Sequence, residues 1–163
     1  MASSIKNLSA HNPNELPNGK NFKFGVVVSE YYSEITNNLL KGCLETFAQQ
    51  DVDEQNIHVI YAPGTYELPA ACHLLNEQDD FDAIIAFGCV VKGETDHDVY
   101  INQSVANALQ QLSIQYKKPF LFGVLTPNTH QQALDRAGGK HGNKGVEVAI
   151  AALKMADLKR RLD

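Results

Sequence analysis

Four short apolar runs alternate with segments of helical periodicity, and this alternation constrains the fold more than any other feature of the chain. The runs cover residues 22–28, 57–62, 83–87 and 120–125. Their length and composition are typical of strands buried on both faces of a parallel sheet. Because repeated strand-then-helix units build a helix-covered sheet through right-handed crossovers, we predict an α/β fold. We expect a flavodoxin-like three-layer αβα sandwich with a four-stranded parallel sheet.

The segments after these runs carry apolar residues three and four positions apart, which predicts amphipathic helices. The expected apolar stripes, in chain order, are Ile35, Leu39, Leu40, Cys43, Leu44 and Phe47; Leu68, Ala71, Cys72 and Leu75; Val99, Val105, Leu109, Leu112 and Tyr116; Ala133, Leu134 and Ala137; and Val146, Ala149, Ile150, Leu153 and Ala156. Glycines punctuate residues 135–145, where we expect a hinge before the last helix.

The length of 163 residues, with 44% hydrophobic and 20% charged residues, predicts one compact domain rather than a disordered chain. Residues 1–21 are rich in asparagine, proline and glycine, which break regular patterns. We therefore expect a polar N-terminal lead at 1–21, poorly ordered on its own, and a single domain at 22–163. Ile5 and Leu8 are isolated apolar residues of the lead that could dock on a neighbouring surface.

Charge and composition exclude several classes of partner and location. The net charge of −5 disfavours nucleic-acid binding, so an anionic ligand would need a local cluster of cations and N–H groups. No run approaches the ~18 apolar residues of a membrane span, and the N-terminus has no apolar signal region. Three cysteines without CxxC spacing fit reduced thiols. We predict a cytoplasmic protein with neither membrane nor nucleic acid as a partner.

Residues 88–97, GCVVKGETDH, connect the third predicted strand to a predicted helix. In open α/β sheets, ligands bind outside the carboxyl ends of the strands. Glu94 and Thr95 lie where the helix should begin, so free backbone N–H groups there can bind an anion. Gly93 would allow a sharp turn, and His97 in the first helical turn could transfer protons. An ordinary loop with a surface histidine fits the same residues, and spacing alone leaves both interpretations open.

Two other predicted strand ends deliver aromatic and hydrogen-bonding side chains. Tyr31 and Tyr32 follow the first strand, and either could offer a flat face to a heterocycle. The residues alone favour partly buried tyrosines that cover the helix start, because the aromatic preference is not specific. Thr65, Tyr66 and Glu67 follow a Pro-Gly turn and could serve a polyhydroxy ligand. Glu67 also fits a first-turn acid that complements the helix dipole.

Basic residues before the last helix are candidate anion contacts. Arg136 could hold a phosphate with two hydrogen bonds, or it could be a helix C-terminal cation paired with Asp135. Position alone does not separate these two uses. Lys140 and Lys144 could add positive potential in the same hinge.

Other chemistries find no support in the motifs. The chain has no GxSxG elbow, P-loop or GxGxxG fingerprint. Residues 96–98, Asp-His-Asp, do not predict a zinc site, because adjacent residues on a helix diverge and no second histidine lies four positions on.

With these residues, the chain resembles the 6,7-dimethyl-8-ribityllumazine synthase family from about residue 24 to residue 155. The matching motifs, in order, are PGTYELP at 63–69, GCVVKGETDH at 88–97, GVLT at 123–126, QALDRAG at 132–138 and NKG at 143–145. The resemblance implies a transferase of riboflavin biosynthesis that needs no metal or cofactor. It also implies the substrates, 5-amino-6-ribitylamino-uracil and 3,4-dihydroxy-2-butanone 4-phosphate, which condense to the lumazine with release of phosphate and water.

The resemblance also assigns roles to single residues. His97 matches the family's proton-transfer histidine, and Tyr31 matches the aromatic residue that stacks on the pyrimidine. Phe122 matches a ring contact from a neighbouring subunit, and Lys144 a basic position near the pocket. The other matches are the ribityl-binding segment Thr65, Tyr66 and Glu67, the uracil-binding strand end Cys89, Val90 and Val91, and the phosphate contacts Glu94, Thr95 and Arg136.

Two residues depart from the family's pattern. Tyr32 stands where an asparagine is common, so no side-chain hydrogen bond is carried over to it. Lys92 stands where an arginine is frequent, and lysine cannot make the bidentate contact of a guanidinium.

The resemblance implies self-association as a homopentamer with shared sites, and in many members as a shell of 60 subunits. The short segment 138–145 permits the shell, whereas Pro13 and Pro17 in the lead disfavour strand-like packing there. We therefore expect the pentamer and favour the shell only weakly. Riboflavin synthase is a candidate partner. A non-catalytic flavin- or lumazine-binding module and a pure shell protein are the alternatives, but neither needs His97 and Arg136.

Overall fold

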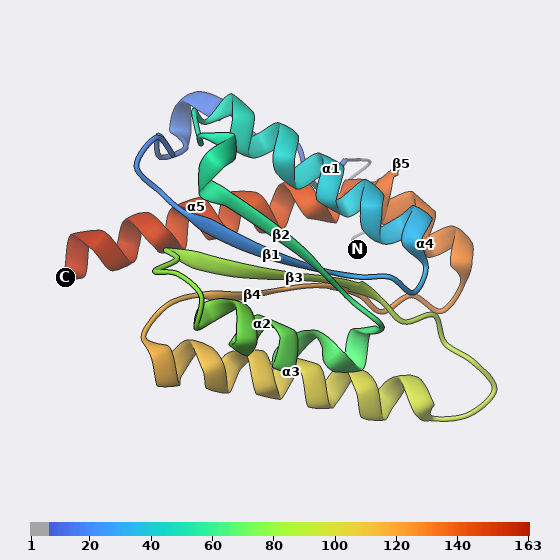
Figure 1. The fold of residues 1–163 in the computed structure, drawn as a ribbon. Coiled ribbons are helices and arrows are strands. Elements are labelled where there is room, and N and C mark those ends of the chain that lie inside the picture. Colours follow the sequence, from blue (N-terminus) through green and yellow to red (C-terminus); the bar gives the residue numbers. More distant parts are fainter. Residues whose placement is uncertain (1–6) are drawn as a thin grey trace.

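The computed structural model describes residues 7–163 as a parallel sheet between two layers of helices (Figure 1). The strands of the main sheet are β1 (Phe24–Ser29), β2 (Ile57–Ala62), β3 (Ala83–Cys89) and β4 (Phe120–Leu125), and a small hairpin adds β5 (Ala137–Gly139) and β6 (Gly142–Asn143). The α-helices are α1 (Ser33–Gln49), α2 (Leu68–Asn76), α3 (His97–Tyr116), α4 (His130–Arg136) and α5 (Lys144–Leu162). Short 3-10 turns cover Pro13–Glu15, Glu54–Asn56 and Thr65–Glu67.

The main sheet has the strand order β2-β1-β3-β4, and every neighbouring pair is parallel. β1 and β3 are central and buried along their whole length, whereas β2 and β4 form the edges. Val26 of β1 lies opposite Val59 of β2 and Ile85 of β3. These observations confirm the predicted flavodoxin-like three-layer fold. Because all four strands are parallel, the loops that follow them lie at one edge of the sheet.

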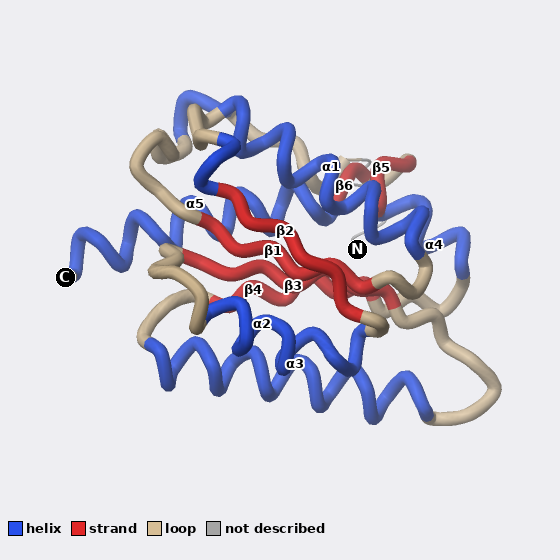
Figure 2. Tube along the Cα trace, viewed as in Figure 1, coloured by secondary structure: helices blue, strands red, loops and turns tan. Residues whose placement is uncertain are grey.

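Helices α1 and α5 cover one face of the sheet, and α2 and α3 cover the other (Figure 2). On the first face, Phe24 of β1 stacks on Phe47 of α1 with ring centroids 4.3 Å apart. On the second, Leu68 of α2 and Leu109 of α3 are buried against the sheet. Burial stabilises the fold by about 1.5–3 kcal/mol for each such side chain. Within the described residues, no helix combines the length and apolar character that a membrane crossing needs.

One predicted strand limit and one predicted buried residue were wrong. Phe22 is buried but precedes β1, because its N–H donates to the Gly19 carbonyl in a turn (2.9 Å) and the sheet pairing starts at Phe24. Val99 was expected in the buried stripe of α3 but is 41% exposed, whereas Val105 and Leu109 are buried as predicted. The first turn of α3 extends past the edge of the sheet (Figure 1), and Val99 on this turn is exposed.

The expected hinge at 135–145 is an antiparallel hairpin of β5 and β6. Ala137 therefore opens β5 rather than closing the apolar stripe of α4. In α5, Ala149, Leu153 and Ala156 are buried as predicted. Val148 and Ala152 are also buried, whereas Val146 and Ile150 are only half-buried. A hairpin satisfies the backbone of this glycine-rich segment, which the periodicity of side chains could not reveal.

The described part of the N-terminal lead runs along the domain. The Leu8 N–H donates to the His141 carbonyl at 3.0 Å, and the Asn143 N–H donates to the Ser9 hydroxyl at 3.1 Å. These bonds place Leu8 beside the β5–β6 hairpin, while Ile5 lies outside the described residues. The division of the chain at residues 21 and 22 stays a prediction.

Candidate functional site

The predicted site residues fall into two separate pockets. The first, which we call the tyrosine pocket, has a volume of about 440 Å³. It is lined by Tyr31, Tyr32, Gly64, Thr65, Tyr66, Glu67, Cys89, Val90, Val91, His97 and Ile101. The second, the arginine pocket, has a volume of about 650 Å³. It is lined by Phe122, Val124, Leu125, Thr126, Pro127, Gln132, Asp135, Arg136, Lys140, His141 and Lys144.

The tyrosine pocket is assembled from the carboxyl ends of three parallel strands and the start of α3. The β1–α1 loop gives the tyrosines, the 3-10 turn after β2 gives Thr65–Glu67, and the end of β3 leads into Val90 and Val91. His97 is the first residue of α3. All eight of the predicted site residues in this pocket meet because parallel strands deliver their loops to the same edge.

Tyr31 and Tyr32 have different environments. Tyr31 is 66% exposed, whereas Tyr32 is half-buried and packs against the core on the α1 face. Their rings meet edge to face, with centroids 5.1 Å apart and planes at 86°. The expectation of two partly buried tyrosines is therefore correct for Tyr32 and wrong for Tyr31. An exposed aromatic face at a pocket is free to stack on a flat ligand.

The Thr65 hydroxyl is a buried polar group that makes no hydrogen bond within the described part of the chain. Thr65 is 5% exposed, and its Oγ1 has no hydrogen-bond partner among the described residues. A Cβ on Gly88 would lie 2.7 Å from that oxygen, so glycine allows the β2–α2 turn to pack on the end of β3. An unsatisfied buried hydroxyl costs about 1–3 kcal/mol. A hydroxyl or amide of a ligand that reached Thr65 would recover this energy.

The segment after β3 presents backbone groups to the pocket. The Val90 N–H donates to the Leu125 carbonyl at 2.9 Å, and the Lys92 N–H donates to the Pro127 carbonyl at 3.0 Å. Residues 90–92 therefore continue alongside the chain that follows β4. Successive N–H groups of an extended segment point to opposite sides, so the Val91 N–H points away from β4. An amide edge such as that of a pyrimidine could pair with it.

Cys89 and His97 differ in their capacity for chemistry. Cys89 is 2% exposed, and burial raises the pKa of its thiol to about 11. The thiol is therefore neutral near pH 7 and unsuited to nucleophilic attack. His97 is exposed at the N-terminus of α3 and lines the pocket. An imidazole in this position is suited to proton transfer near neutral pH.

In the arginine pocket, Arg136 is fixed by a partner that the sequence did not indicate. Its Nη2 donates to Oε2 of Glu147 on α5 at 2.6 Å, and its Nη1 donates to the His141 carbonyl at 3.1 Å. The two side chains of the ion pair are only 21% and 25% exposed. Asp135, the local partner considered from sequence, instead lies 3.6 Å from Nζ of Lys140. The guanidinium has five N–H donors, so donors remain for an anion.

The charges of this pocket are nearly balanced. Lys144 lies 3.9 Å from the Glu147 carboxylate that Arg136 also binds. Arg136, Lys140 and Lys144 thus stand against two carboxylates, Asp135 and Glu147. The remaining positive charge is a local exception in a chain with a net charge of −5. A phosphate could bind by sharing Arg136 and Lys144 with Glu147.

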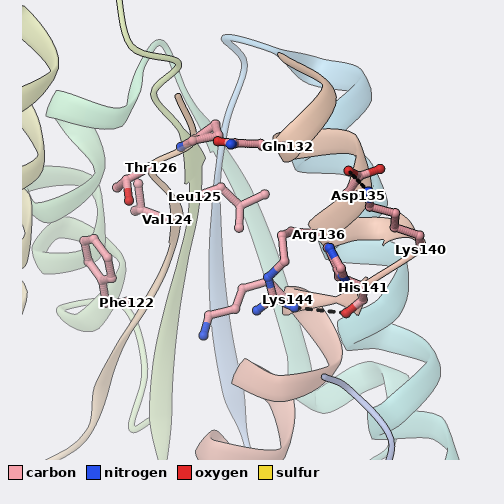
Figure 3. A pocket seen from close by; sticks show the side chains of 11 residues that line it. Phe122, Val124, Leu125, Thr126, Gln132, Asp135, Arg136, Lys140, His141 and Lys144 are labelled. Atoms are coloured by element: carbon pink, nitrogen blue, oxygen red, sulfur yellow. Dashed lines mark hydrogen bonds and ion pairs between the residues drawn. The ribbon is translucent and has the colours of Figure 1, made fainter. Parts of the chain in front are cut away.

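Phe122 lies on the far side of this pocket from the cations. Figure 3 shows its ring on β4, across the opening from Arg136 and Lys144. Phe122 is 36% exposed and β4 is an edge strand. An exposed aromatic side chain on an open sheet edge is placed to contact a second molecule.

The structure does not bring every predicted residue together. His97, the candidate for proton transfer, and Arg136, the candidate phosphate contact, line different pockets of one chain. Glu94 and Thr95 are exposed in the loop before α3 and line neither pocket. A Cβ on Gly93 would meet nothing within 4 Å, so the described chain does not itself require glycine there.

Two residues that hold Arg136 in place were missed by the sequence analysis. Glu147 carries the ion pair with Arg136, and its only signal was the i,i+3 spacing from Lys144 on the last helix. His141 lines the pocket and gives its carbonyl to Arg136. No sequence pattern marked His141, because its place depends on the hairpin.

Comparisons with known proteins point to one family. The sequence profile of 6,7-dimethyl-8-ribityllumazine synthase matches residues 21–160. A protein of that name from Porphyromonas gingivalis is 47% identical over 160 residues, covering 98% of this chain and 99% of the relative. Others from Flavobacterium johnsoniae and Phocaeicola vulgatus are both 42% identical and cover 99% of this chain, with 85% and 96% of the relatives covered.

Proposed function

The chain belongs to the 6,7-dimethyl-8-ribityllumazine synthase family, an enzyme family of riboflavin biosynthesis. We propose that this protein catalyses the formation of the lumazine. In this reaction 5-amino-6-ribitylamino-uracil and 3,4-dihydroxy-2-butanone 4-phosphate condense to 6,7-dimethyl-8-ribityllumazine, phosphate and water. The observation that carries the proposal is the pairing of an aromatic, hydroxyl-bearing pocket with a cationic one on the same chain. One suits a ribityl-pyrimidine and the other a phosphate.

The tyrosine pocket binds the ribityl-pyrimidine. The exposed ring of Tyr31 stacks on the flat heterocycle, and the backbone at Val90 and Val91 pairs with its amide edge. The unsatisfied Thr65 hydroxyl, with the neighbouring Tyr66 and Glu67, holds the hydroxyls of the ribityl chain. Cys89 contributes through its backbone, because its side chain is buried.

The arginine pocket binds the phosphate of the second substrate. Arg136 is held rigidly by Glu147, which lowers the entropy lost when it binds an anion. Lys144 adds a second positive charge beside the same carboxylate. Glu94 and Thr95 line neither pocket of one chain, so they join this contact only from a neighbouring subunit, through the exposed loop before α3.

The chemistry needs proton transfers more than it needs a nucleophile. The amine adds to the ketone and loses water to form an imine. Loss of the proton from the neighbouring hydroxyl-bearing carbon then lets phosphate leave with its bonding electrons from the next carbon. The resulting enol takes a proton on carbon to become a ketone, and ring closure of the ribitylamino nitrogen onto that ketone releases a second water. Each step moves a proton to or from nitrogen, oxygen or carbon, and His97 at the start of α3 is the group that moves it. The neutral thiol of Cys89 takes no part in these steps.

We propose that two copies of the chain complete each site, because Phe122 is exposed on the edge strand β4 and the two pockets of one chain share no lining residue. A head-to-tail contact brings the tyrosine pocket of one subunit against Phe122 and Arg136 of the next. Such contacts close into a ring, and we propose a homopentamer, with a weaker preference for its assembly into a shell of 60. Light scattering should give the mass of a pentamer or of a multiple of it, and a fully active monomer or dimer contradicts the shared site.

Subunit complementation tests the reaction and the shared site together. His97→Ala damages the tyrosine pocket and Arg136→Ala the arginine pocket, and each variant alone should retain little synthase activity. In mixed rings from equal co-expression, about a quarter of the contacts join two intact halves, so activity should return to about that fraction of wild type. If mixing restores nothing, the site forms within one chain. If wild-type protein makes no lumazine from the two substrates, the proposed reaction is wrong.

A further inference from the structure

Tyr32 has a backbone conformation that helix capping does not explain. Among the described residues, three that are not glycine have positive φ: Tyr32, Asp51 and Lys117. Asp51 and Lys117 follow the ends of α1 and α3, where the left-handed region is common. Tyr32 instead precedes a helix, with φ 55° and ψ 50°, and its side chain makes no capping hydrogen bond. N-cap residues are normally extended and carry short polar side chains.

The ring of Tyr32 lies in a chain of contacts that reaches the pocket. On one side it meets Tyr31 edge to face, with centroids 5.1 Å apart. On the other it meets the imidazole of His130, with centroids 6.1 Å apart and planes at 44°. His130 Nε2 lies 2.8 Å from Oε1 of Glu34. This pair joins the start of α4 to the start of α1, which lie side by side (Figure 1).

Tyr31 has little else to fix its ring. It is 66% exposed, and its own backbone N–H is bound to the Ser29 hydroxyl at 3.3 Å. An exposed aromatic side chain exchanges among rotamers, and a ligand that stacks on it must bear the entropy of fixing one of them. A neighbouring ring held at 86° to it favours one orientation before the ligand arrives.

We propose that Tyr32 is a positioning residue that orients the Tyr31 ring for stacking, and that the His130–Glu34 pair braces Tyr32 from behind. The left-handed backbone places the Tyr32 ring between these partners, and its half-buried side chain anchors it to the core. This inference rests on the proposed function, since it takes Tyr31 as the platform for the pyrimidine. Tyr32 acts through Tyr31 and need not touch the ligand.

The first test compares two substitutions of Tyr32 in the assembled protein. Tyr32→Asn removes the ring but suits the left-handed backbone, so folding is kept, and Tyr32→Phe keeps the ring. Calorimetric titration with 6,7-dimethyl-8-ribityllumazine should show about two- to tenfold weaker binding for Tyr32→Asn and near-complete rescue in Tyr32→Phe. In kinetics, KM for the ribityl-pyrimidine should rise while kcat and KM for the butanone phosphate change little. Equal losses in both substrates overturn the positioning role.

A double-substitution cycle separates positioning from direct contact. Tyr31→Ala should weaken lumazine binding, and Tyr31→Ala with Tyr32→Asn should bind as Tyr31→Ala alone does, because no platform is left to orient. If the two losses multiply instead, Tyr32 contributes independently and the inference is wrong. If Tyr31→Ala binds like wild type, the platform in the proposed function fails. If Tyr31→Ala is weakened but Tyr32→Asn is not, only the positioning role fails.

The brace is tested at its outer end. His130→Ala should reproduce part of the Tyr32→Asn loss, again as a change in KM for the ribityl-pyrimidine. Glu45→Ala is the matched control, because it removes the exposed Lys41–Glu45 pair of α1, at 4.0 Å, without touching either tyrosine. A His130→Ala protein that binds the lumazine as the Glu45→Ala protein does excludes the brace.

Discussion

The tyrosine pocket and the arginine pocket differ in what holds their polar groups in place. In the tyrosine pocket, aromatic, hydroxyl and backbone groups stand on loops packed against a buried sheet, and the buried Thr65 hydroxyl has no partner among residues 7–163. In the arginine pocket, cations are held by carboxylates, above all Arg136 by Glu147. The first pocket is defined by packing and the second by a charge balance.

This difference indicates which changes each pocket tolerates. A packed pocket with an unsatisfied hydroxyl gives up stability to keep a group ready for a ligand. A charge-balanced pocket pairs its cations with its own carboxylates, and a phosphate enters by sharing the cations. Ionic strength should therefore weaken binding in the arginine pocket more than in the tyrosine pocket. Single substitutions in one pocket at a time should separate these two kinds of site.

The largest effect should come from Arg136→Ala, which breaks the arginine pocket only. A hydrogen bond to a charged group is worth about 1.5–3 kcal/mol, so kcat/KM for the butanone phosphate should fall by roughly 10- to 150-fold. The unpaired Glu147 then adds repulsion of the phosphate. Binding of the lumazine should change much less.

Steady-state kinetics with each substrate varied in turn will measure this selectivity. Arg161→Ala is the matched control, since Arg161 pairs with Asp157 at 2.9 Å near the other end of α5. Equal losses of affinity for both ligands in Arg136→Ala contradict a phosphate-specific role.

His97→Ala should slow the reaction while the tyrosine pocket still binds its ligand. General acid–base catalysis is typically worth about 10²–10⁴-fold, and amine–ketone condensation is intrinsically facile. We therefore expect kcat to fall by about 100-fold or less, with lumazine affinity nearly kept. Single-turnover rates beside calorimetric titration will check this, with His11→Ala, in the exposed N-terminal lead, as the control. If His97→Ala keeps the wild-type kcat, His97 is not the proton-transfer group.

Thr65→Val should raise the free energy of unfolding and at the same time weaken lumazine binding in the tyrosine pocket. The change deletes a buried hydroxyl that has no partner among the described residues, so the free energy of unfolding should rise by about 1 kcal/mol. Losing a hydrogen bond to the ribityl chain should weaken binding by about two- to tenfold. Urea unfolding and lumazine titration measure the two effects. A less stable variant with unchanged affinity would show that Thr65 is structural.

Cys89→Ala, at the buried edge of the tyrosine pocket, should have the smallest effect on activity near neutral pH, and its effect on stability should depend on pH. Burial raises the pKa of Cys89 to about 11, above the ~8.5 of an unfolded cysteine. The folded state holds this proton more tightly, so the resulting stability is complete below about pH 8.5 and is lost as the pH rises toward 11. The lost stability amounts to at most about 1.4 kcal/mol per pH unit.

Cys89→Ala should therefore flatten the alkaline decline of the free energy of unfolding, measured by urea unfolding at pH 8, 9 and 10. The decline should not vanish, because burial also raises the pKa of Cys43 and Cys72. An unchanged slope means that Cys89 ionises in the folded protein as readily as in the unfolded one.

Much of the site followed from local sequence, because hydrophobic periodicity is a local property. The four apolar runs predicted four strands. Tyr31, Thr65 and Cys89 each come after one of the first three runs, and His97 begins the helix that follows the third. Parallel strands bring such positions to one edge whatever the details of packing. The prediction failed at Val99, whose exposure depends on how far α3 extends past the sheet.

The sequence by itself determined the fold class, the family resemblance and most of the residues that line the tyrosine pocket. Only the tertiary structure showed that Arg136 binds Glu147 rather than Asp135, that residues 135–145 form a hairpin, and that His97 and Arg136 line different pockets. These facts depend on strand order and on which face of the sheet α5 covers. Contacts between residues on different elements are fixed by packing, which no spacing along the chain encodes.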